Sequence, residues 1–420
     1  MEHLSVTNAQ QCILESVNKL DIETVGLEQS LGRVLAEDVR ANRDIPPYDV
    51  SAMDGYALCS ADLAKIPATL KIVEDIKAGD MPSKQVGAGQ CARIMTGAPM
   101  PRGADTVIRV EDTDVVSDGS VQINVKVKPG NDIRLQGEGM RNGDVVLAAG
   151  TEITPGVIGI LATVKSKQMR VYRRPRVAIL STGDELEGMD DPVDPNKIPN
   201  SNSYALMAQL QALGIEPTLL GIARDDPAEL AEYLQRGLRF DVLLVSGGSS
   251  VGVHDYVRPT MEALGVRMKF WRVAMKPGHP LAFGVLQQNG DGTPKDSFVF
   301  GLPGNPVSSM VCFEEFVTPM LRSMMGHARL YRRTLTARLT HDVKHQAGRT
   351  EFVRVTLAKD GSGYVATSTG SQGSGMLLSM ARADGLLVVP ADSTGLIAGE
   401  QVTVQLLDGT AFQNEIEFRE

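Results

Sequence analysis

Residues 175–326 alternate between apolar runs and amphipathic runs, and this alternation restricts the fold more than any other feature. The apolar runs PRVAILSTG and FDVLLVSGGSS each end in a polar turn, and NSYALMAQLQALG has the composition of a helix. Val/Ile/Leu-rich strands that alternate with helices are typical of a parallel sheet covered on both faces. We therefore predict a Rossmann-like parallel α/β domain over residues 175–326.

The rest of the 420-residue chain has other patterns, so the predicted fold class is multidomain α/β and β. Apolar residues at helical spacing predict a helix over residues 5–36. Short β-type runs between Gly, Pro, Asp and Asn turns predict two β-rich regions. The predicted domains are a small helical or linker domain of residues 1–45 plus 141–174, a β-rich domain of residues 46–140, the α/β domain, and an all-β C-terminal domain of residues 332–420.

Local signals also predict several helix ends. Thr154 followed by Pro155 is well placed to open a helix, and Pro227 suits the first position of another. Gly214 is expected to end the helix that precedes it. Ser5 or Thr7 can cap the N-terminal helix.

Composition excludes several classes of function. The formal net charge of −9 and the lack of a long Lys/Arg run argue against a nucleic-acid-binding surface. The densest basic cluster, YRRPR at residues 172–176, is interpreted as a solvated turn before a strand. The four cysteines form no CxxC motif, and no apolar stretch reaches the roughly 18 residues that a membrane helix needs. The N-terminus does not resemble a signal peptide, so we expect a cytoplasmic protein without membrane contact.

Four predicted strands of the α/β domain end in turns that carry polar residues. Ligands of open α/β sheets bind beyond the carboxyl ends of the strands, so these turns are expected to meet in one crevice. A single turn is weak evidence, since ARDDP alone is typical of a helix N-cap, and the shared position of all four strengthens the prediction. The turns are STGDEL (181–186), ARDDP (223–227), SGGSSVGVHDY (246–256) and GLPGNPVSS (301–309).

These turns combine carboxylates with glycines whose backbone N–H groups suit anions. Acidic side chains and anion-binding turns in one crevice indicate a phosphorylated ligand with a divalent cation such as Mg²⁺. No His/Cys cluster indicates a soft metal, and the six histidines show no Ser-His-Asp context.

Six motifs in this order resemble the MoeA family of molybdopterin molybdenumtransferases, to which the E domain of gephyrin is also similar. The resemblance spans nearly the whole chain, and the ordered set is far more specific than any one motif. The motifs are SAMDGYA (51–57), RIMTGAPMPRGADTVI (93–108), STGDEL, SGGSSVGVHDY, MKPGHP (275–280) and GLPGNPVS.

The resemblance implies an elongated homodimer of four-domain subunits, with the active site at the subunit interface. It implies a reaction that takes adenylylated molybdopterin and molybdate, requires Mg²⁺, and releases AMP with molybdenum left on the dithiolene. It also implies as partners a molybdopterin adenylyltransferase and factors that mature molybdoenzymes.

By the same resemblance, catalytic positions fall on two predicted domains. Those expected to be catalytic are Asp54, Thr96, Glu185, Asp225, Asp255 and Lys276. Those expected to bind the pterin substrate or molybdate are Asp184, Ser250, Pro303, Pro306, Ser308 and Ser374. Our hypothesis is that Glu185, Asp225 and Asp255 position Mg²⁺ or a water near the adenylate. Lys276 and the backbone amides of residues 302–308 are expected to hold molybdate or the pterin phosphate.

The chain departs from the family pattern at three positions. The RRxGED segment of the family reads IRLQGEGM here, with Gly139 in place of an acid. The KPGKP turn reads KPGHP, so that His279 replaces a fixed positive charge and makes anion binding sensitive to pH. A lysine common in the preceding strand is Arg272.

Three alternatives remain at this stage. Gly139 and His279 are compatible with a non-catalytic molybdopterin-binding scaffold or carrier of the same family. A single-domain molybdopterin adenylyltransferase is disfavoured by the extra domains before residue 175 and after residue 332. A nicotinamide dehydrogenase is disfavoured because STGDEL is not GxGxxG and places acids where a pyrophosphate would bind.

Overall fold

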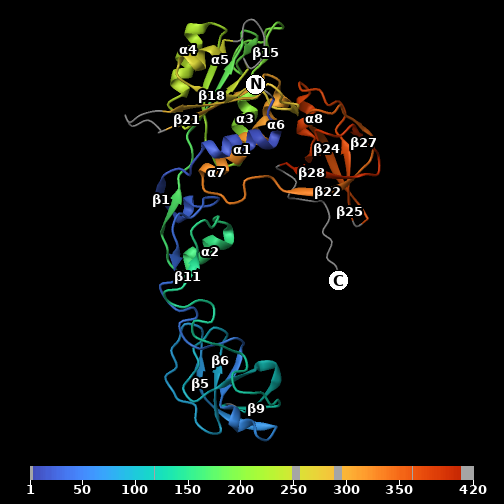
Figure 1. The fold of residues 1–420 in the computed structure, drawn as a ribbon. Coiled ribbons are helices and arrows are strands. Elements are labelled where there is room, and N and C mark those ends of the chain that lie inside the picture. The colour runs from blue at the N-terminus through green and yellow to red at the C-terminus, as the bar shows by residue number, and fades with distance from the viewer. Residues whose placement is uncertain (1–2, 118, 248–255, 288–295, 362, 408–420) are drawn as a thin grey trace. The chain divides into compact units, whose positions relative to one another are not determined.

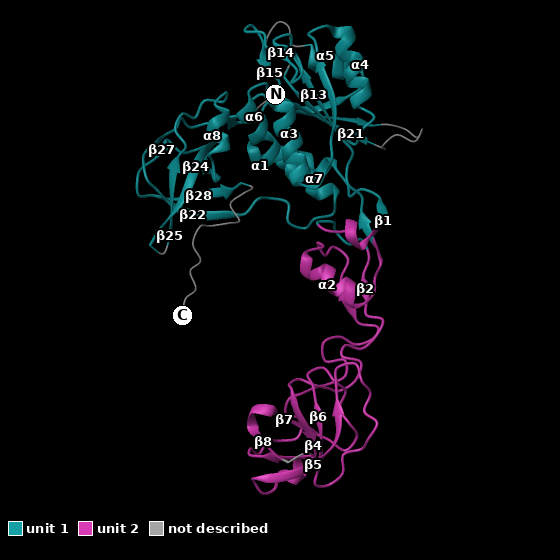
Figure 2. Cartoon of the chain, turned by 180° about the vertical axis from the view of Figure 1, so that it is seen from behind, with its two compact units in different colours: residues 1–23, 32–36, 170–420 teal, residues 24–31, 37–169 magenta. Residues whose placement is uncertain are grey.

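The structure, a computed structural model, divides into two compact units (Figure 2). Unit 1 comprises residues 1–23, 32–36 and 170–420, and unit 2 comprises residues 24–31 and 37–169. The residues described are 3–117, 119–247, 256–287, 296–361 and 363–407. The strands β1 (Ile22–Gly26) and β12 (Gln168–Tyr172) lie where the chain passes from one unit to the other.

A six-stranded sheet forms the centre of the α/β part of unit 1 (Figure 1). Its order is β16 (Thr218–Ala223), β13 (Val177–Thr182), β17 (Val242–Ser246), β21 (Asp296–Leu302), β20 (Ala282–Gln287) and β18 (Arg267–Phe270). The first four strands are parallel, as predicted, but β20 and β18 are antiparallel to their neighbours. No helix separates β18, β20 and β21 within the described residues, and strands joined without a crossover helix pair antiparallel.

Helices cover both faces of this sheet, as the apolar strands require. Ile179 and Leu244 point to one face, where they share an apolar cluster with α1, α3 and the α6–α7 run. Leu180 and Leu243 point to the other face and pack with α4 and α5. The helices are α1 (Val6–Ser16), α3 (Ser201–Ala212), α4 (Pro227–Gly237), α5 (Val257–Ala263), α6 (Pro306–Cys312), a π-helical turn (Phe313–Val317) and α7 (Thr318–Met324). No helix in the described ranges is long and apolar enough to cross a membrane.

The predicted helix over residues 5–36 is much shorter in the structure. Helix α1 starts after its N-cap Ser5 and ends at Ser16, and β1 follows it. The β-branched residues of IETVG favour the extended strand over a continued helix. Ala9 and Ile13 of α1 are buried in the same cluster as the α6–α7 run, so residues 1–23 belong to unit 1, whereas residues 141–169 belong to unit 2.

Other predicted helix ends are confirmed. The Thr154 side chain accepts a hydrogen bond from Val157 N–H at the start of α2 (Pro155–Thr163), with Pro155 in the first turn. Asp226 caps α4 in the same way, with Pro227 in the first turn. Helix α3 ends just before Gly214, whose φ of +73° is the left-handed conformation of a helix C-terminus.

The C-terminal part of unit 1 is a second six-stranded sheet that includes a strand from the α/β part. Strand β19 (Met275–Lys276) pairs in parallel with β24 (Thr350–Asp360). The other strands of this sheet are β25 (Gly363–Ser368), β22 (Thr334–Leu339), β28 (Gln401–Leu406) and β26 (Gly385–Val389). Smaller elements of unit 1 are β14 (Leu186–Glu187), β15 (Ile198–Pro199), β23 (Val343–Lys344), α8 (Leu377–Ala381) and β27 (Gly395–Leu396).

Unit 2 is built mainly from a six-stranded β-sheet with short accessory pairs. The sheet order is β7 (Thr106–Arg109), β4 (Gly55–Leu58), β6 (Gln90–Ile94), β5 (Ala68–Ile76), β9 (Ser120–Ile123) and β8 (Thr113–Ser117). The short strands are β2 (Val39–Arg40), β3 (Val50–Ser51), β10 (Ile133–Arg134) and β11 (Val145–Leu147), and single 3-10 turns lie at Leu27–Gln29, Ser60–Leu63 and Val110–Asp112.

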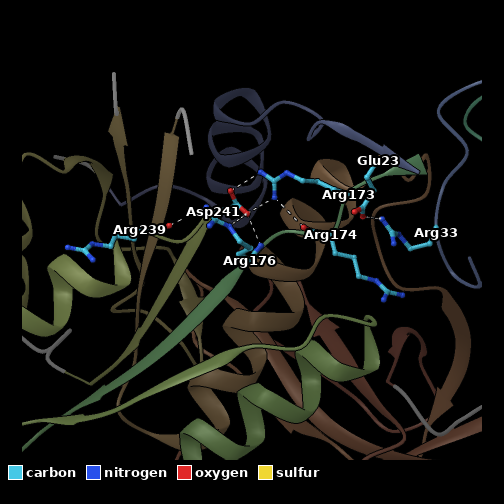
Figure 3. A network of polar contacts seen from close by, with 7 residues as sticks. All are labelled: Glu23, Arg33, Arg173, Arg174, Arg176, Arg239 and Asp241. Carbon is cyan, nitrogen blue, oxygen red and sulfur yellow. Dashed lines mark hydrogen bonds and ion pairs between the residues drawn. The ribbon is translucent and has the colours of Figure 1, made fainter. Parts of the chain in front are cut away.

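A buried ion pair fixes the start of β13 (Figure 3). The Asp241 carboxylate accepts hydrogen bonds from Arg173 Nη1 at 2.7 Å and Nη2 at 2.9 Å, and from Arg176 N–H at 2.7 Å. Burial raises the pKa of this carboxyl, but the hydrogen bonds from Arg173 and Arg176 and their charges outweigh burial, so the pKa lies below its ordinary value. The basic cluster at 172–176 is therefore more than a solvated turn, because it joins the starts of β13 and β17.

The substitution Asp241→Asn is expected to lower the free energy of unfolding by about 2–3 kcal/mol, because the Arg173 guanidinium loses its buried counter-charge. The folded-state pKa of Asp241 lies below the unfolded value, so its stabilisation is present above about pH 4 and is lost as the pH falls further. Urea unfolding at neutral pH and at about pH 3 measures both effects. Glu262→Gln, which breaks the exposed Arg258–Glu262 pair, is the control and should cost at most about 0.5 kcal/mol. Equal losses for the two variants would contradict the assignment.

Candidate functional site

A cleft of about 1090 Å³ lies at the carboxyl ends of the parallel strands in unit 1. Thr182 of β13, Ser246 of β17 and Pro303 after β21 line it, as does Asn202 at the start of α3. The loop before α8 adds Gly375, so the C-terminal part of the unit also contributes to the wall. This is the position in which an open α/β sheet binds its ligand.

The acidic turn after β13 places one carboxylate in the cleft. Glu185 lines the cleft, and its Oε2 lies 2.4 Å from where a Cβ would stand on Gly183, so the side chain folds back over that glycine. The carbonyls of the turn are held by cations: Arg224 Nη1 donates to the Leu186 oxygen at 3.0 Å, and Lys197 Nζ donates to the Asp184 oxygen. The turn is thus fixed through its backbone.

Asp184 of this turn and Asp225 beside it are predicted acids that are not among the described residues lining the cleft. Asp184 Oδ1 accepts a hydrogen bond from the Asp225 N–H at 3.3 Å, and both side chains are exposed. Asp255 and Ser250 fall outside the described residues, so the predicted trio of Glu185, Asp225 and Asp255 is represented by two members. Within the described ranges, no group of three His, Cys, Asp or Glu side chains lies close enough to hold a metal ion.

Two glycines bring neighbouring strand ends into close contact. Gly247 has a φ of +101°, and a Cβ built on it would lie 2.4 Å from the Thr182 carbonyl oxygen. Gly304, after β21, packs against it, with 3.7 Å between its notional Cβ and the Gly247 Cα. A side chain at residue 247 would push apart the strand ends that form the floor of the cleft.

Asparagines at the start of α3 are residues that the sequence prediction missed. Asn202 Nδ2 donates to the Ser246 Oγ at 2.8 Å and to the Gly304 oxygen at 2.7 Å, which ties the helix to two strand ends. Asn200 accepts the Ser203 N–H as N-cap, and its Oδ1 also accepts from the buried Ser181 hydroxyl at 2.9 Å. The polar run NSNSY before an apolar helix is the signal by which a sequence prediction could have found them.

The turn after β21 provides fewer anion-binding amides than predicted. Pro303 and Pro306 line the cleft but have no N–H. The Val307 N–H donates to the Ser374 carbonyl oxygen at 3.1 Å. Ser308 is buried within α6 and is not among the residues of the wall. The Ser374 carbonyl thus joins the C-terminal loop to α6.

Lys276 points to a partner in the C-terminal sheet. Its Nζ lies 2.8 Å from Oε1 of the buried Glu351, whose other oxygen accepts from His345 Nδ1 at 2.8 Å. Lys276 is not among the residues that line the cleft, where Arg272 and His279 supply the basic groups. The basic side chains among the described lining residues are therefore Arg272 and His279, while Lys276 pairs with Glu351.

His279 is held in a defined orientation on the cleft wall. Its Nδ1 lies 2.7 Å from the Val273 carbonyl oxygen, which only accepts, so Nδ1 carries the proton. Burial lowers the pKa of His279, and the charges of Arg349, His3 and Arg272 lower it further, although the bond to Val273 opposes this. The ring is therefore mainly neutral at neutral pH, with Nε2 free of a proton.

The predicted residues of the β-rich region form a separate pair in unit 2. Asp54 Oδ1 accepts the Thr96 N–H at 2.7 Å and the Thr96 hydroxyl at 2.8 Å, and these bonds lower the pKa of the exposed Asp54 carboxyl. Gly139 follows Glu138, whose Oε2 accepts the Leu135 N–H at 3.0 Å. A Cβ at residue 139 would lie 3.1 Å from the Ile45 carbonyl oxygen, so the backbone is packed closely at this departure from the family pattern.

Three family models match the chain, in order along the sequence. They are described as "MoeA N-terminal region (domain I and II)", which matches residues 4–164, "Probable molybdopterin binding domain", which matches residues 178–323, and "MoeA C-terminal region (domain IV)", which matches residues 336–407.

Individual proteins match over nearly the full length. A molybdopterin molybdenumtransferase from Nostoc sp. is 38% identical over 411 residues, which are 95% of this chain and 93% of the relative. A relative of the same name from Staphylococcus aureus strain COL is 32% identical over 418 residues, or 98% of each. Among solved structures, the molybdopterin biosynthesis MoeA protein of Pyrococcus horikoshii OT3 matches with a TM-score of 0.82 and 30% identity. The match covers 97% of this chain and 100% of that structure's chain.

The two glycines of the cleft floor provide a matched test of its geometry. Gly247→Ala is expected to destabilise the protein by about 2 kcal/mol or more, because the new Cβ meets the Thr182 carbonyl at a positive φ. In Gly304→Ala the new Cβ has its nearest neighbouring atom at 3.7 Å, and the backbone φ is not positive. The free energy of unfolding should therefore fall by no more than about 0.5–1 kcal/mol. Thermal unfolding followed by circular dichroism compares them. Equal melting temperatures for the two variants would disprove the close approach of Gly247 to the Thr182 carbonyl.

Proposed function

The chain belongs to the MoeA family, and on this basis we propose that it inserts molybdenum into adenylylated molybdopterin and releases AMP. The names of its relatives support a transferase of molybdenum cofactor biosynthesis. The observation that carries the proposal is the cleft at the strand ends, with Glu185 on its wall together with Arg272 and His279. Its volume of about 1090 Å³ is large enough for a nucleotide joined to a pterin.

The proposed step on the nucleotide side is cleavage of a phosphoanhydride. Water attacks one phosphorus and the bridging P–O bond to it breaks, so that the anhydride yields AMP and the pterin phosphate and the water's proton goes to solvent. Negative charge spreads over the phosphoryl oxygens, so the protein contributes chiefly by positioning and charge neutralisation. Arg272 supplies a fixed positive charge for this, and Glu185 is placed to orient a water.

Mg²⁺ is part of the proposal, and two of the predicted acids offer it oxygen ligands. In phosphoryl-transfer sites this ion is usually held by one or two carboxylates together with substrate phosphates and water. Glu185 in the cleft and Asp225 beside the same turn would hold it, and both offer the hard oxygen ligands that Mg²⁺ prefers. When bound, the ion would neutralise charge on the phosphates.

Asp54 and Thr96 are proposed to act on the substrate from the β-rich region. The two hydrogen bonds from Thr96 hold one carboxylate oxygen of Asp54, and within the described ranges the other oxygen stays available to a ligand. The expected homodimer with a site at its subunit interface, the adenylyltransferase and maturation partners, and the cytoplasmic location all remain part of this proposal.

The competing function is a non-catalytic scaffold that binds molybdopterin. Gly139 favours it, because the chain has no carboxylate at a position where the family usually has one. The scaffold and the enzyme differ in one measurable property, which is turnover of the adenylate.

Purified protein given adenylylated molybdopterin and Mg²⁺ is expected to release AMP when molybdate is added and to retain molybdenum on the pterin. Chromatography of AMP and elemental analysis of the protein-bound pterin measure the two products. Glu185→Gln should slow release by roughly a hundredfold with an intact fold, while Asp190→Asn, an exposed acid of the same loop, should not. Tight pterin binding without AMP release in the unaltered protein would instead support the scaffold.

Binding of molybdate is expected to strengthen as the pH falls through the pKa of His279, which lies below the usual value for histidine. The protonated ring attracts the anion, and the neutral ring does not. Calorimetric titrations from about pH 5 to pH 8 test this, and His279→Lys should remove most of the pH dependence because lysine stays charged throughout. A wild-type affinity that does not change over this range would exclude His279 from the anion site.

A further inference from the structure

Two adjacent carboxyl groups are buried in the π-helical turn between α6 and α7. Glu314 and Glu315 are each 5% exposed, and all five residues of the turn are buried. A π-helical turn holds one residue more than an α-helical turn, and such turns are frequent at functional sites. Glutamate is almost never buried unless a partner offsets the loss of water. The partners of these two carboxyls therefore decide which of them is charged.

The two carboxyls have partners of different kinds. Glu314 Oε2 accepts a hydrogen bond from Arg332 Nε at 2.8 Å, and its Oε1 accepts one from Gln209 Nε2 at 2.8 Å. Glu315 Oε1 accepts a hydrogen bond from the amide of Gln405, also at 2.8 Å. Within the described residues, Glu314 thus has a cationic hydrogen-bond partner, while that of Glu315 is neutral.

Ionisation of Glu315 is unfavourable in this environment. Burial of the carboxyl, together with the charge of Glu314, raises its pKa to about 8, although the hydrogen bond from Gln405 and the charge of Arg332 lower it in part. At neutral pH, Glu315 is therefore mainly the uncharged acid. Its ionisation would place a second negative charge next to Glu314, and one guanidinium would have to offset both.

The Glu315 side chain lies where the α/β core meets the C-terminal sheet. Its partner Gln405 belongs to β28, and Gln10 of α1 donates to the Glu315 backbone carbonyl at 3.0 Å. Burial raises the pKa of the Cys312 thiol and of the Tyr331 hydroxyl, so both stay uncharged at neutral pH. The described titratable groups that face Glu315 come from α6, the π-helical turn and the segment before β22, and they are Cys312, Glu314, Tyr331 and Arg332.

We propose that the contact of Glu315 with Gln405 is a proton-dependent contact between the α/β core and the C-terminal sheet. It stays closed while Glu315 is uncharged. When it opens, water reaches the carboxyl, which then releases its proton to solvent. The C-terminal part also supplies Gly375 and Leu377 to the cleft wall, so the contact links pH to one side of the cleft. This inference goes beyond the proposed function and does not depend on it.

The direction of the pH effect follows from the two pKa values of Glu315. The value in the folded protein, about 8, lies above the ordinary value of about 4.5 that holds once water reaches the carboxyl. The stabilisation of the closed contact is therefore fully present below about pH 4.5 and is lost as the pH rises to about 8. Above that pH the carboxyl is ionised in both states, and the loss levels off.

Hydrogen exchange of the full-length protein between about pH 5 and pH 9 measures the opening. The informative peptides cover the π-helical turn and β28, and a peptide that covers β17 reports on the centre of the α/β sheet. After correction for the intrinsic exchange rate, opening at the turn and at β28 should increase about tenfold per pH unit up to about pH 8, the effect of one proton. Both segments should open more often than β17 at each pH.

Three variants separate Glu315 from other acids. Glu315→Gln keeps the size of the side chain and has no proton to release, so this increase with pH should disappear. Glu314→Gln removes the neighbouring negative charge, so the increase should level off at a lower pH. Glu262→Gln, at an exposed position of α5, is the matched control and should behave as the wild type does.

Two results would overturn the inference. One is the same pH dependence of opening in the wild type and in Glu315→Gln, which would assign the effect to another group. The other is equal opening of β28 and β17 at each pH, which would mean that the contact opens only when the whole unit unfolds. None of these measurements requires turnover, so the proposed function is judged separately by molybdate-dependent AMP release.

Discussion

The parallel register of β13, β17 and β21 is the constraint on which the site depends. Ser181 lies opposite Ser246, and Ser246 opposite Leu302, so three strands end at the same level. Parallel strands place every carboxyl end on one edge, and helices that start at that edge add their first residues to it. The direction of the strands therefore determines where the cleft lies, and the residue at which each strand ends determines which side chains line it. The Asp241 ion pair acts at the opposite ends of β13 and β17 and holds that register.

Much of this arrangement could be predicted from local sequence. Strand ends are marked by the change from Val, Leu and Ile to Ser, Thr and Gly, and this located Glu185 and the Pro303–Pro306 turn correctly on the cleft. The contacts of Asn202 could not be predicted, because its partners Ser246 and Gly304 are 44 and 102 residues away. Likewise, the sequence of the KPGHP turn does not reveal that Glu351 pairs with Lys276.

The predictions that the structure changed concern the backbone: the amides after β21, the length of the first helix and the direction of β20. The amides of residues 302–308 looked suited to an anion, but Val307 already donates to Ser374, and two prolines donate nothing. The helix predicted over residues 5–36 failed because apolar spacing alone does not outweigh the β-branched residues of β1. The predicted parallel sheet changed direction at β20 where no crossover helix connects it to β21.

The pairing of β19 with β24 has a consequence for how the protein is divided. Met275 and Lys276 belong by sequence to the α/β part, yet their backbone completes the C-terminal sheet, and Phe352, Met380 and Leu386 of the C-terminal part are buried in the α/β core. The C-terminal segment is therefore not a detachable module. A shortened chain that stops before residue 334 would expose apolar side chains of the α/β core. It would also leave β19, which lies just before His279, without its partner strand. The two segments are thus expected to change together when the sequence of the shared core changes.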